Sequence, residues 1–198
     1  MAVQVYPLLA RGVFATYGYF VIDSETACGF LVDPGAQPRL FLAAIRENGW
    51  DIEAILFTHG HFDHIYGMAD LVRRYGIPVY VHRSEAFTLE KTNPYVCSAF
   101  GLPLPDTYPL LGEGEESSVV FVAEGDEIKV GELSLEVIET PGHTTGGICC
   151  LERKEKVLFS GDTLFAGAIG RTDHPGGDYD TLMRSIFEKL LHLSLIHI

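Results

Sequence analysis

Basic residues are scarce in this sequence, with 14 lysines and arginines against 27 aspartates and glutamates and a formal net charge of −13. So acidic a chain has no surface that could neutralise a phosphate backbone, and we expect no nucleic-acid partner. Long hydrophobic runs are also absent. No stretch approaches the roughly 20 apolar residues that a membrane-spanning helix needs. We therefore expect a soluble protein that does not enter a membrane.

The N-terminal residues lack the basic leader, apolar run and small-residue cleavage site of a secretory signal, which favours a cytoplasmic protein. Cysteines are few, and Cys28, Cys97, Cys149 and Cys150 form neither a disulfide framework nor a paired C-x-x-C metal site. We expect four buried thiols. Cys149 and Cys150 are adjacent and should point to opposite faces of a strand.

The last six residues, Leu193 to Ile198, match the translation of a transposon-end adapter used in sequencing libraries. We interpret them as an artefact, so that the natural protein is expected to continue with other residues. The sequence then predicts one domain over residues 1–192, incomplete at its C-terminus, and an adapter-derived segment over 193–198.

Hydrophobic periodicity predicts two β-rich halves with helices outside them. In the first half we expect a hairpin over 13–23 and 28–32, helices over 38–48 and 64–75, and buried strands over 54–57 and 78–81. Proline and glycine then predict a long loop over 92–118 that could cover a substrate. In the second half we expect strands over 119–121, 127–130, 133–139, 148–151 and 156–159, and a final amphipathic helix over 178–191.

The strongest chemical signal is the segment Thr58-His59-Gly60-His61-Phe62-Asp63-His64, directly after a predicted buried strand. Imidazole and carboxylate are ligands of zinc and iron. A tight turn from strand to helix aims alternate side chains at two neighbouring points. We expect His59 and His61 to serve one metal and Asp63 and His64 another, with Gly60 allowing a strained backbone and the Thr58 hydroxyl supporting the ligands.

Two later strand ends have the same character. Thr-Pro-Gly-His-Thr at 140–144 presents His143, and Ser-Gly-Asp-Thr at 160–163 presents Asp162. His143 would complete three nitrogens around the first metal, and Asp162 has an oxygen for each of two metals. Such a pair of metals would activate a water molecule as the nucleophile.

This set of six residues, His59, His61, Asp63, His64, His143 and Asp162, resembles the motif of the metallo-β-lactamase superfamily. Further segments resemble its single-domain glyoxalase II-like hydrolases, namely Val-Asp-Pro-Gly at 32–35, the loop at 140–144, and residues 161–165 through Gly-Arg-Thr-Asp at 170–173. The resemblance implies an α/β fold, an αββα four-layer sandwich with the metals at one edge, here without its last strand and helix segment.

In that branch the resemblance also implies two Zn²⁺ ions, with iron as the alternative, and hydrolysis of a small-molecule thioester such as S-lactoylglutathione. Asp63 and Asp162 are the expected catalytic residues, orienting the attacking water and relaying its proton. The oligomeric state is not predicted.

Two features of the superfamily are missing from this sequence. A last histidine, usually in a Pro-Gly-His-Gly setting after the final helix, has no counterpart, and we assign neither His192 nor His197 to that role. The helical extension that grips glutathione in glyoxalase II is also absent. We therefore expect a weakened second metal site and poor activity for this chain, up to metal binding without turnover.

Weaker candidates and other activities stay open. Arg171 and Asp173 are candidates for a substrate loop, or for an ion pair that shapes their turn. His82 and His174 are expected to be solvated or to support the ligands. The competing functions are a persulfide dioxygenase, with one iron on His59, His143 and Asp162, and a lactone or β-lactam hydrolase.

Overall fold

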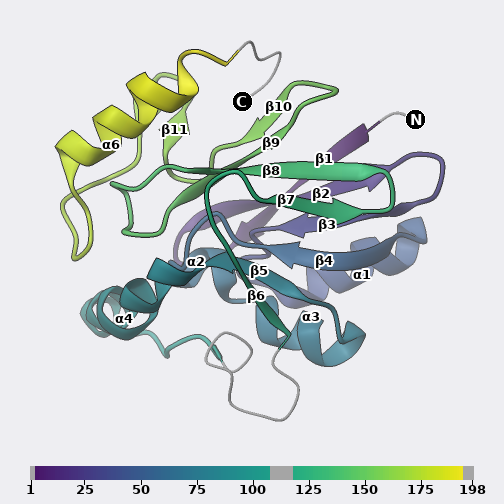
Figure 1. Ribbon diagram of the computed structural model, residues 1–198. Coiled ribbons are helices and arrows are strands. Elements are labelled where there is room, and N and C mark those ends of the chain that lie inside the picture. The colour runs from purple at the N-terminus through teal and green to yellow at the C-terminus, as the bar shows by residue number, and fades with distance from the viewer. Residues whose placement is uncertain (1–2, 108–117, 194–198) are drawn as a thin grey trace.

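Two β-sheets pack face to face, and helices cover the outer face of each (Figure 1). The computed structural model describes residues 3–107 and 118–193. The arrangement confirms the expected αββα sandwich. Residues 194–198 lie outside the described part, so the interpretation of the chain's end as adapter-derived stays a prediction.

The larger sheet has six strands in the order β1-β2-β3-β4-β5-β6. The pairs β1–β2 and β2–β3 are antiparallel, and the remaining pairs are parallel. Its strands are β1 (Val3–Arg11), β2 (Ala15–Asp23), β3 (Cys28–Val32), β4 (Asp51–Leu56), β5 (Val79–His82) and β6 (Val119–Val122). The sequence did not predict β1, which contains Pro7. It is an edge strand, where a missing backbone N–H is tolerated.

The smaller sheet is antiparallel in the order β10-β9-β8-β7, and a separate two-stranded hairpin, β11–β12, follows it along the chain. The strands are β7 (Glu127–Val130), β8 (Leu133–Glu139), β9 (Ile148–Glu152), β10 (Val157–Phe159), β11 (Leu164–Phe165) and β12 (Ala168–Ile169). The hairpin was not predicted, because two-residue strands leave no periodic pattern.

The helices are α1 (Pro38–Asn48), α2 (Phe62–Ile65), α3 (Met68–Tyr75), α4 (Asn93–Phe100) and α6 (Tyr179–Ser185), with short turns η1 (Arg83–Glu85), η2 (Thr88–Thr92) and η3 (Ile186–Leu190). The final helix thus ends in a π-helical turn. The single helix predicted over 64–75 is wrong, since α2 and α3 are separated at Gly67. A Cβ there would lie 2.8 Å from the carbonyl oxygen of Pro34, which accepts a hydrogen bond from the Gly67 N–H.

The prediction of a loop over residues 92–118 is also wrong in part, because α4 occupies its beginning. Pro94 stands in the first turn of α4, where a missing N–H costs nothing, and Gly101 ends the helix in the left-handed conformation. The helix buries only Asn93 and Cys97, too few positions to produce a visible period. Residues 108–117 lie outside the described part of the chain.

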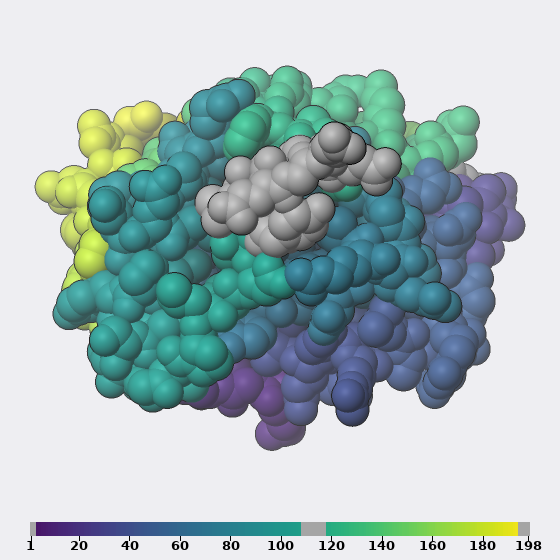
Figure 2. Space-filling model, turned by 90° about the horizontal axis from the view of Figure 1, so that it is seen from below, coloured from purple at the N-terminus to yellow at the C-terminus, as the bar shows by residue number. Residues whose placement is uncertain are grey.

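Three apolar layers hold the sandwich together. Phe41 of α1 and Leu71 of α3 pack on the outer face of the larger sheet, and Val21 belongs to the layer between the sheets. Leu182 of α6 packs on the outer face of the smaller sheet. Figure 2 shows the face of the molecule on which the segments containing α1, α3 and α4 lie. Of the residues that the structure describes, none forms a helix long and apolar enough to cross a membrane.

The four thiols are free, and Cys97, Cys149 and Cys150 are buried. Cys149 belongs to the layer beneath α6 and Cys150 to the layer between the sheets, which confirms that the two point to opposite faces of β9. Cys28 is only half-buried, because it begins strand β3. The expectation of four buried thiols was therefore wrong for Cys28.

Candidate metal centre

Three loops meet at one edge of the sandwich, each following a strand. The first follows β4 and carries His59, the second connects β8 to β9 and carries His143, and the third connects β10 to β11 and carries Asp162. The first two are joined by the backbone hydrogen bond from the N–H of Ile148 to the carbonyl oxygen of Thr58, 2.8 Å long. The edge therefore gathers polar side chains from both sheets.

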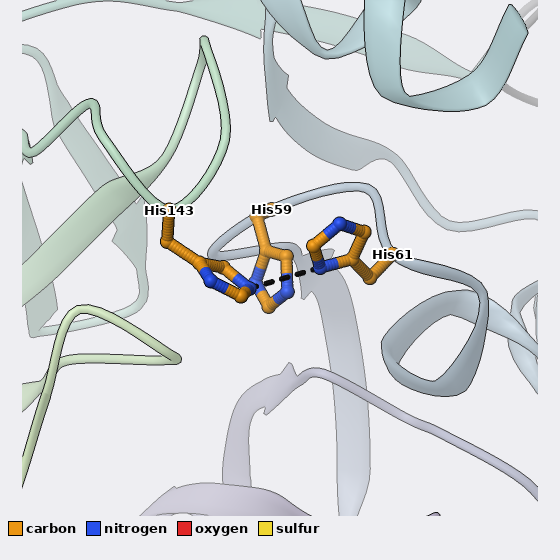
Figure 3. A group of neighbouring side chains, drawn as sticks. All are labelled: His59, His61 and His143. Atoms are coloured by element: carbon orange, nitrogen blue, oxygen red, sulfur yellow. Dashed lines mark hydrogen bonds between the residues drawn. The ribbon is translucent and has the colours of Figure 1, made fainter. Parts of the chain in front are cut away.

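His59, His61 and His143 form a buried cluster in which one nitrogen of each ring lies within 4.8 Å of the others. Figure 3 shows the rings turned toward one another, with Nε2 of His143 and Nδ1 of His61 separated by 2.9 Å. Three converging imidazole nitrogens can hold a divalent metal ion.

A chain of hydrogen bonds fixes the proton on His59. The Thr58 hydroxyl donates its one proton to Oδ2 of Asp33 at 2.6 Å, so it accepts from Nδ1 of His59 at 3.1 Å. Nε2 of the neutral ring then carries a lone pair, and it is buried without a hydrogen-bond partner. A buried lone pair without a donor is costly, and a metal ion is a partner of the right chemistry.

His143 is oriented in the same manner. Its Nδ1 lies 2.7 Å from the carbonyl oxygen of Arg171, which can only accept a hydrogen bond, so the proton is on Nδ1. Nε2 is thereby left unprotonated and faces His61. The Gly-Arg-Thr-Asp turn thus acts on the site through the Arg171 backbone.

Burial lowers the pKa of His59, His61 and His143, and the neighbouring imidazoles lower those of His59 and His61 further. For His143 the nearby Asp162 carboxylate opposes the effect of burial. All three rings are therefore neutral at neutral pH. Only the neutral ring has a lone pair to offer a metal.

Beside this cluster lies a second group with more carboxylates. Nε2 of His64 is 3.4 Å from Oδ1 of Asp162 and 3.8 Å from Oδ2 of Asp63, while Oδ2 of Asp162 is 3.5 Å from Nε2 of His143. Asp162 therefore stands between the two groups with one oxygen toward each. The structure brings together all six residues that the sequence singled out.

Charges in this second group are strongly coupled. Burial alone would lower the pKa of His64, but the carboxylates of Asp63, Asp162 and Asp33 outweigh it and raise that pKa. Burial would raise the pKa of Asp162, and His64 outweighs it, so that the pKa is lowered. The Asp162 carboxylate is thus ionised across the neutral range.

Asp33, to which the sequence assigned no role, has its carboxylate beside Thr58 and His64. Its carboxylate accepts from the backbone N–H and hydroxyl of Thr58 at 2.8 and 2.6 Å, and its Oδ2 lies 3.0 Å from Nδ1 of His64. Asp33 follows β3, and β3 and β4 are parallel neighbours, so both strands end at the same edge. That adjacency was a usable signal.

Glu85, on η1, was also missed. Its buried carboxylate accepts from the N–H groups of Gly60 and Gly146 at 2.7 and 3.0 Å and from the Thr144 hydroxyl at 2.6 Å. It thus connects the loop of His59 and His61 to the loop of His143. Nothing in the sequence sets it apart from the other acidic residues.

The reason expected for Gly60 was wrong, because this glycine does not have a positive φ. A Cβ at Gly60 would lie 2.9 Å from Oε2 of Glu85. Glycine leaves room there for the buried carboxylate, which also accepts from the Gly60 N–H.

The weaker candidates lie in different places. Arg171 and Asp173 pair with each other on the surface, at 2.9 Å for both contacts, as the ion-pair interpretation predicts. His82 lies away from the histidine cluster and pairs with Glu139 at 3.1 Å. His174 packs against His61 and His143.

The model of the metallo-beta-lactamase superfamily matches residues 11–195 of this sequence, which covers the whole site. The chain belongs to this superfamily. The histidines that cluster at the edge of the sandwich are suited to binding a divalent metal ion.

Among curated relatives, the hydroxyacylglutathione hydrolase GloC of Haemophilus influenzae is 36% identical over 199 residues, covering 98% of this chain and 86% of that protein. Among solved structures, the BLEG-1 B3 metallo-beta-lactamase is 30% identical with a TM-score of 0.83, over 96% of this chain and 87% of that one. TTHA1623 in a di-iron-bound form is 31% identical with a TM-score of 0.76, over 91% and 83%.

Proposed function

We propose that this superfamily member is a cytoplasmic, metal-dependent hydrolase of small-molecule thioesters of the S-lactoylglutathione type. The observation that carries the metal part is Nε2 of His59, a buried lone pair without a partner beside two further imidazoles. The similarity to GloC of H. influenzae supports the thioester part.

His59, His61 and His143 would hold one ion, and Asp63 and His64 a second, with Asp162 shared between them. The donor set fits zinc, and the di-iron form of TTHA1623 keeps iron as the alternative. A divalent metal bound there supplies Lewis acidity and brings the pKa of a water molecule down to about 7.

The protein's own contribution to the reaction comes mainly from Asp162. Its carboxylate stays ionised, and about a third of its side-chain surface is open, 31%. An oxygen of Asp162 can therefore accept a hydrogen bond from a water molecule and orient it for attack on the acyl carbon. Asp63 is held by the Thr16 hydroxyl, which donates to its Oδ2 at 2.7 Å.

A covalent route through cysteine has no support at this site. Cys149 and Cys150 are buried, and burial raises the pKa of Cys149 to about 11 and that of Cys150 as well. Neither supplies thiolate at neutral pH. Water is therefore the nucleophile in the proposed reaction.

The test compares three substrates on the natural full-length protein reconstituted with zinc or with iron. We expect hydrolysis of S-lactoylglutathione, followed by the loss of its thioester absorbance, and loss of this activity in Asp162→Asn. Faster cleavage of a chromogenic cephalosporin would instead favour the lactamase activity named for BLEG-1. Oxygen uptake on glutathione persulfide with one iron per chain would favour the dioxygenase. Either result would overturn the proposal.

A further inference from the structure

His174 lies on the loop between β12 and α6, and its ring packs against two rings of the histidine cluster. The ring centroids are 4.7 Å from His61 and 4.9 Å from His143, with interplanar angles of 90° and 85°. Its ring is therefore adjacent to whatever binds beside these two side chains. The sequence alone favoured a solvated or supporting role for it.

Both ring nitrogens of His174 are buried and lack a hydrogen-bond partner. In the described part of the chain, Nε2 of His59 is the one other buried side-chain nitrogen or oxygen in this condition. A buried polar group without a hydrogen-bond partner is costly, so two such nitrogens on one ring indicate that a ligand supplies the partners. His82 gives the contrast, since both of its nitrogens have protein partners.

The backbone around His174 is firmly held, so the position of the ring is not that of a loose loop. The Thr92 hydroxyl donates to the carbonyl oxygen of Pro175 at 2.7 Å, and the N–H of Gly177 donates to the carbonyl oxygen of His174 at 2.9 Å. The N–H of Asp178 donates to the carbonyl oxygen of Gly142, the residue before His143, at 2.8 Å. The fold thus holds an unsatisfied imidazole against the candidate ligands.

We propose that His174 contacts the acyl part of the substrate and hydrogen-bonds the hydroxyl group next to the thioester carbonyl, which selects 2-hydroxyacyl over plain alkanoyl groups. The inference rests on the proposed thioesterase function. A neutral imidazole offers one donor and one acceptor, and a hydroxyl group can satisfy either. In the described part of the chain, His174 belongs to none of the groups of three potential ligand atoms that lie within 4.8 Å of one another, whereas His59, His61 and His143 form such a group. This favours a substrate contact over a fourth metal ligand for His174.

The test uses His174→Phe, which keeps an aromatic ring and removes both nitrogens, with exposed His192→Phe as the matched control. Two thioesters of glutathione are compared on the zinc-loaded full chain, the lactoyl and the propionyl compound, which differ by one hydroxyl. We expect His174→Phe to reduce the lactoyl-to-propionyl ratio of kcat/KM about tenfold, the size of one buried hydrogen bond. His192→Phe should leave that ratio unchanged.

Two further measurements separate the alternatives. Zinc content of His174→Phe should equal that of the wild type, and a loss of zinc would overturn the proposal by making His174 a metal ligand. An unchanged lactoyl-to-propionyl ratio would overturn it too. If the natural full-length protein hydrolyses neither thioester, the proposed function fails. In that case calorimetry tests the His174 contact by itself, by measuring the affinities of both proteins for lactate and for propionate. We expect the wild type to bind lactate more tightly than propionate and His174→Phe to lose this preference. The same preference in both proteins would refute the contact.

Discussion

Substitution of Glu85 tests whether the metal centre depends on a residue that connects the two ligand-bearing loops. Glu85 does so through hydrogen bonds with Gly60, Thr144 and Gly146. In Glu85→Gln the amide can accept through one oxygen only. If that oxygen keeps Thr144 and Gly146, the NH₂ group faces the N–H of Gly60 and leaves it without an acceptor. One buried donor left unpaired costs about 1–3 kcal/mol of stability. Glu85→Leu leaves at least two backbone N–H groups unpaired, which costs about 2–6 kcal/mol.

The same substitution should weaken metal binding, because Gly60 lies between His59 and His61. Changes behind metal ligands commonly reduce affinity by about 10–100-fold, and we expect Glu85→Gln to fall in that range. The assays are urea unfolding of the chelated protein and competitive zinc titration of the full chain. The matched control is Glu90→Gln, the same change at an exposed position five residues away.

The free energy of unfolding and the zinc affinity together test the role of Glu85. Glu85→Gln should lose both stability and zinc affinity, and Glu90→Gln neither. Full zinc affinity in a destabilised Glu85→Gln would refute the role in positioning the ligand loops. Unchanged stability would refute the argument from unpaired donors.

Further predictions concern the ligands and pH. His143→Ala should lose binding at the three-histidine cluster in zinc titrations, whereas His192→Ala should retain it; equal affinities would remove His143 from the ligand set. Asp162→Asn should keep a near-native circular dichroism spectrum but lose most turnover, and normal hydrolysis would exclude its role in the reaction. Burial lowers the pKa of His59, His61 and His143 below the ordinary 6.5 in the folded protein. As the pH falls, these histidines therefore bind protons in the unfolded chain at a higher pH than in the folded one. The chelated protein should therefore lose unfolding free energy as pH falls below about 6.5, and a rise in urea midpoint there would contradict the burial argument.

Most of the sandwich could be predicted from the sequence, because buried strands and amphipathic helices leave periodic patterns. The prediction failed where tertiary contacts decide the backbone. Gly67 interrupts a helical pattern because the helix start must approach the carbonyl oxygen of Pro34, a residue far away in the sequence. Helix α4 is too short and too little buried to show a period.

The candidate ligands could be predicted for a different reason. Several histidines directly after one buried strand seldom serve only to pack the core. Their supports were less readable. Asp33 acts through the neighbouring parallel strand, Glu85 through backbone N–H groups, and Arg171 through its carbonyl oxygen. Backbone acceptors carry no side-chain signature, and a single buried glutamate looks like any exposed one until its burial is known.

The most direct test of the metal centre is anomalous X-ray diffraction from crystals of the zinc-loaded full chain, recorded on both sides of the zinc absorption edge. We expect a zinc peak bounded by Nε2 of His59, Nδ1 of His61 and Nε2 of His143, whose rings face one another in Figure 3. Zinc found only elsewhere on the protein, with Nε2 of His59 hydrogen-bonded to a protein group, would contradict it.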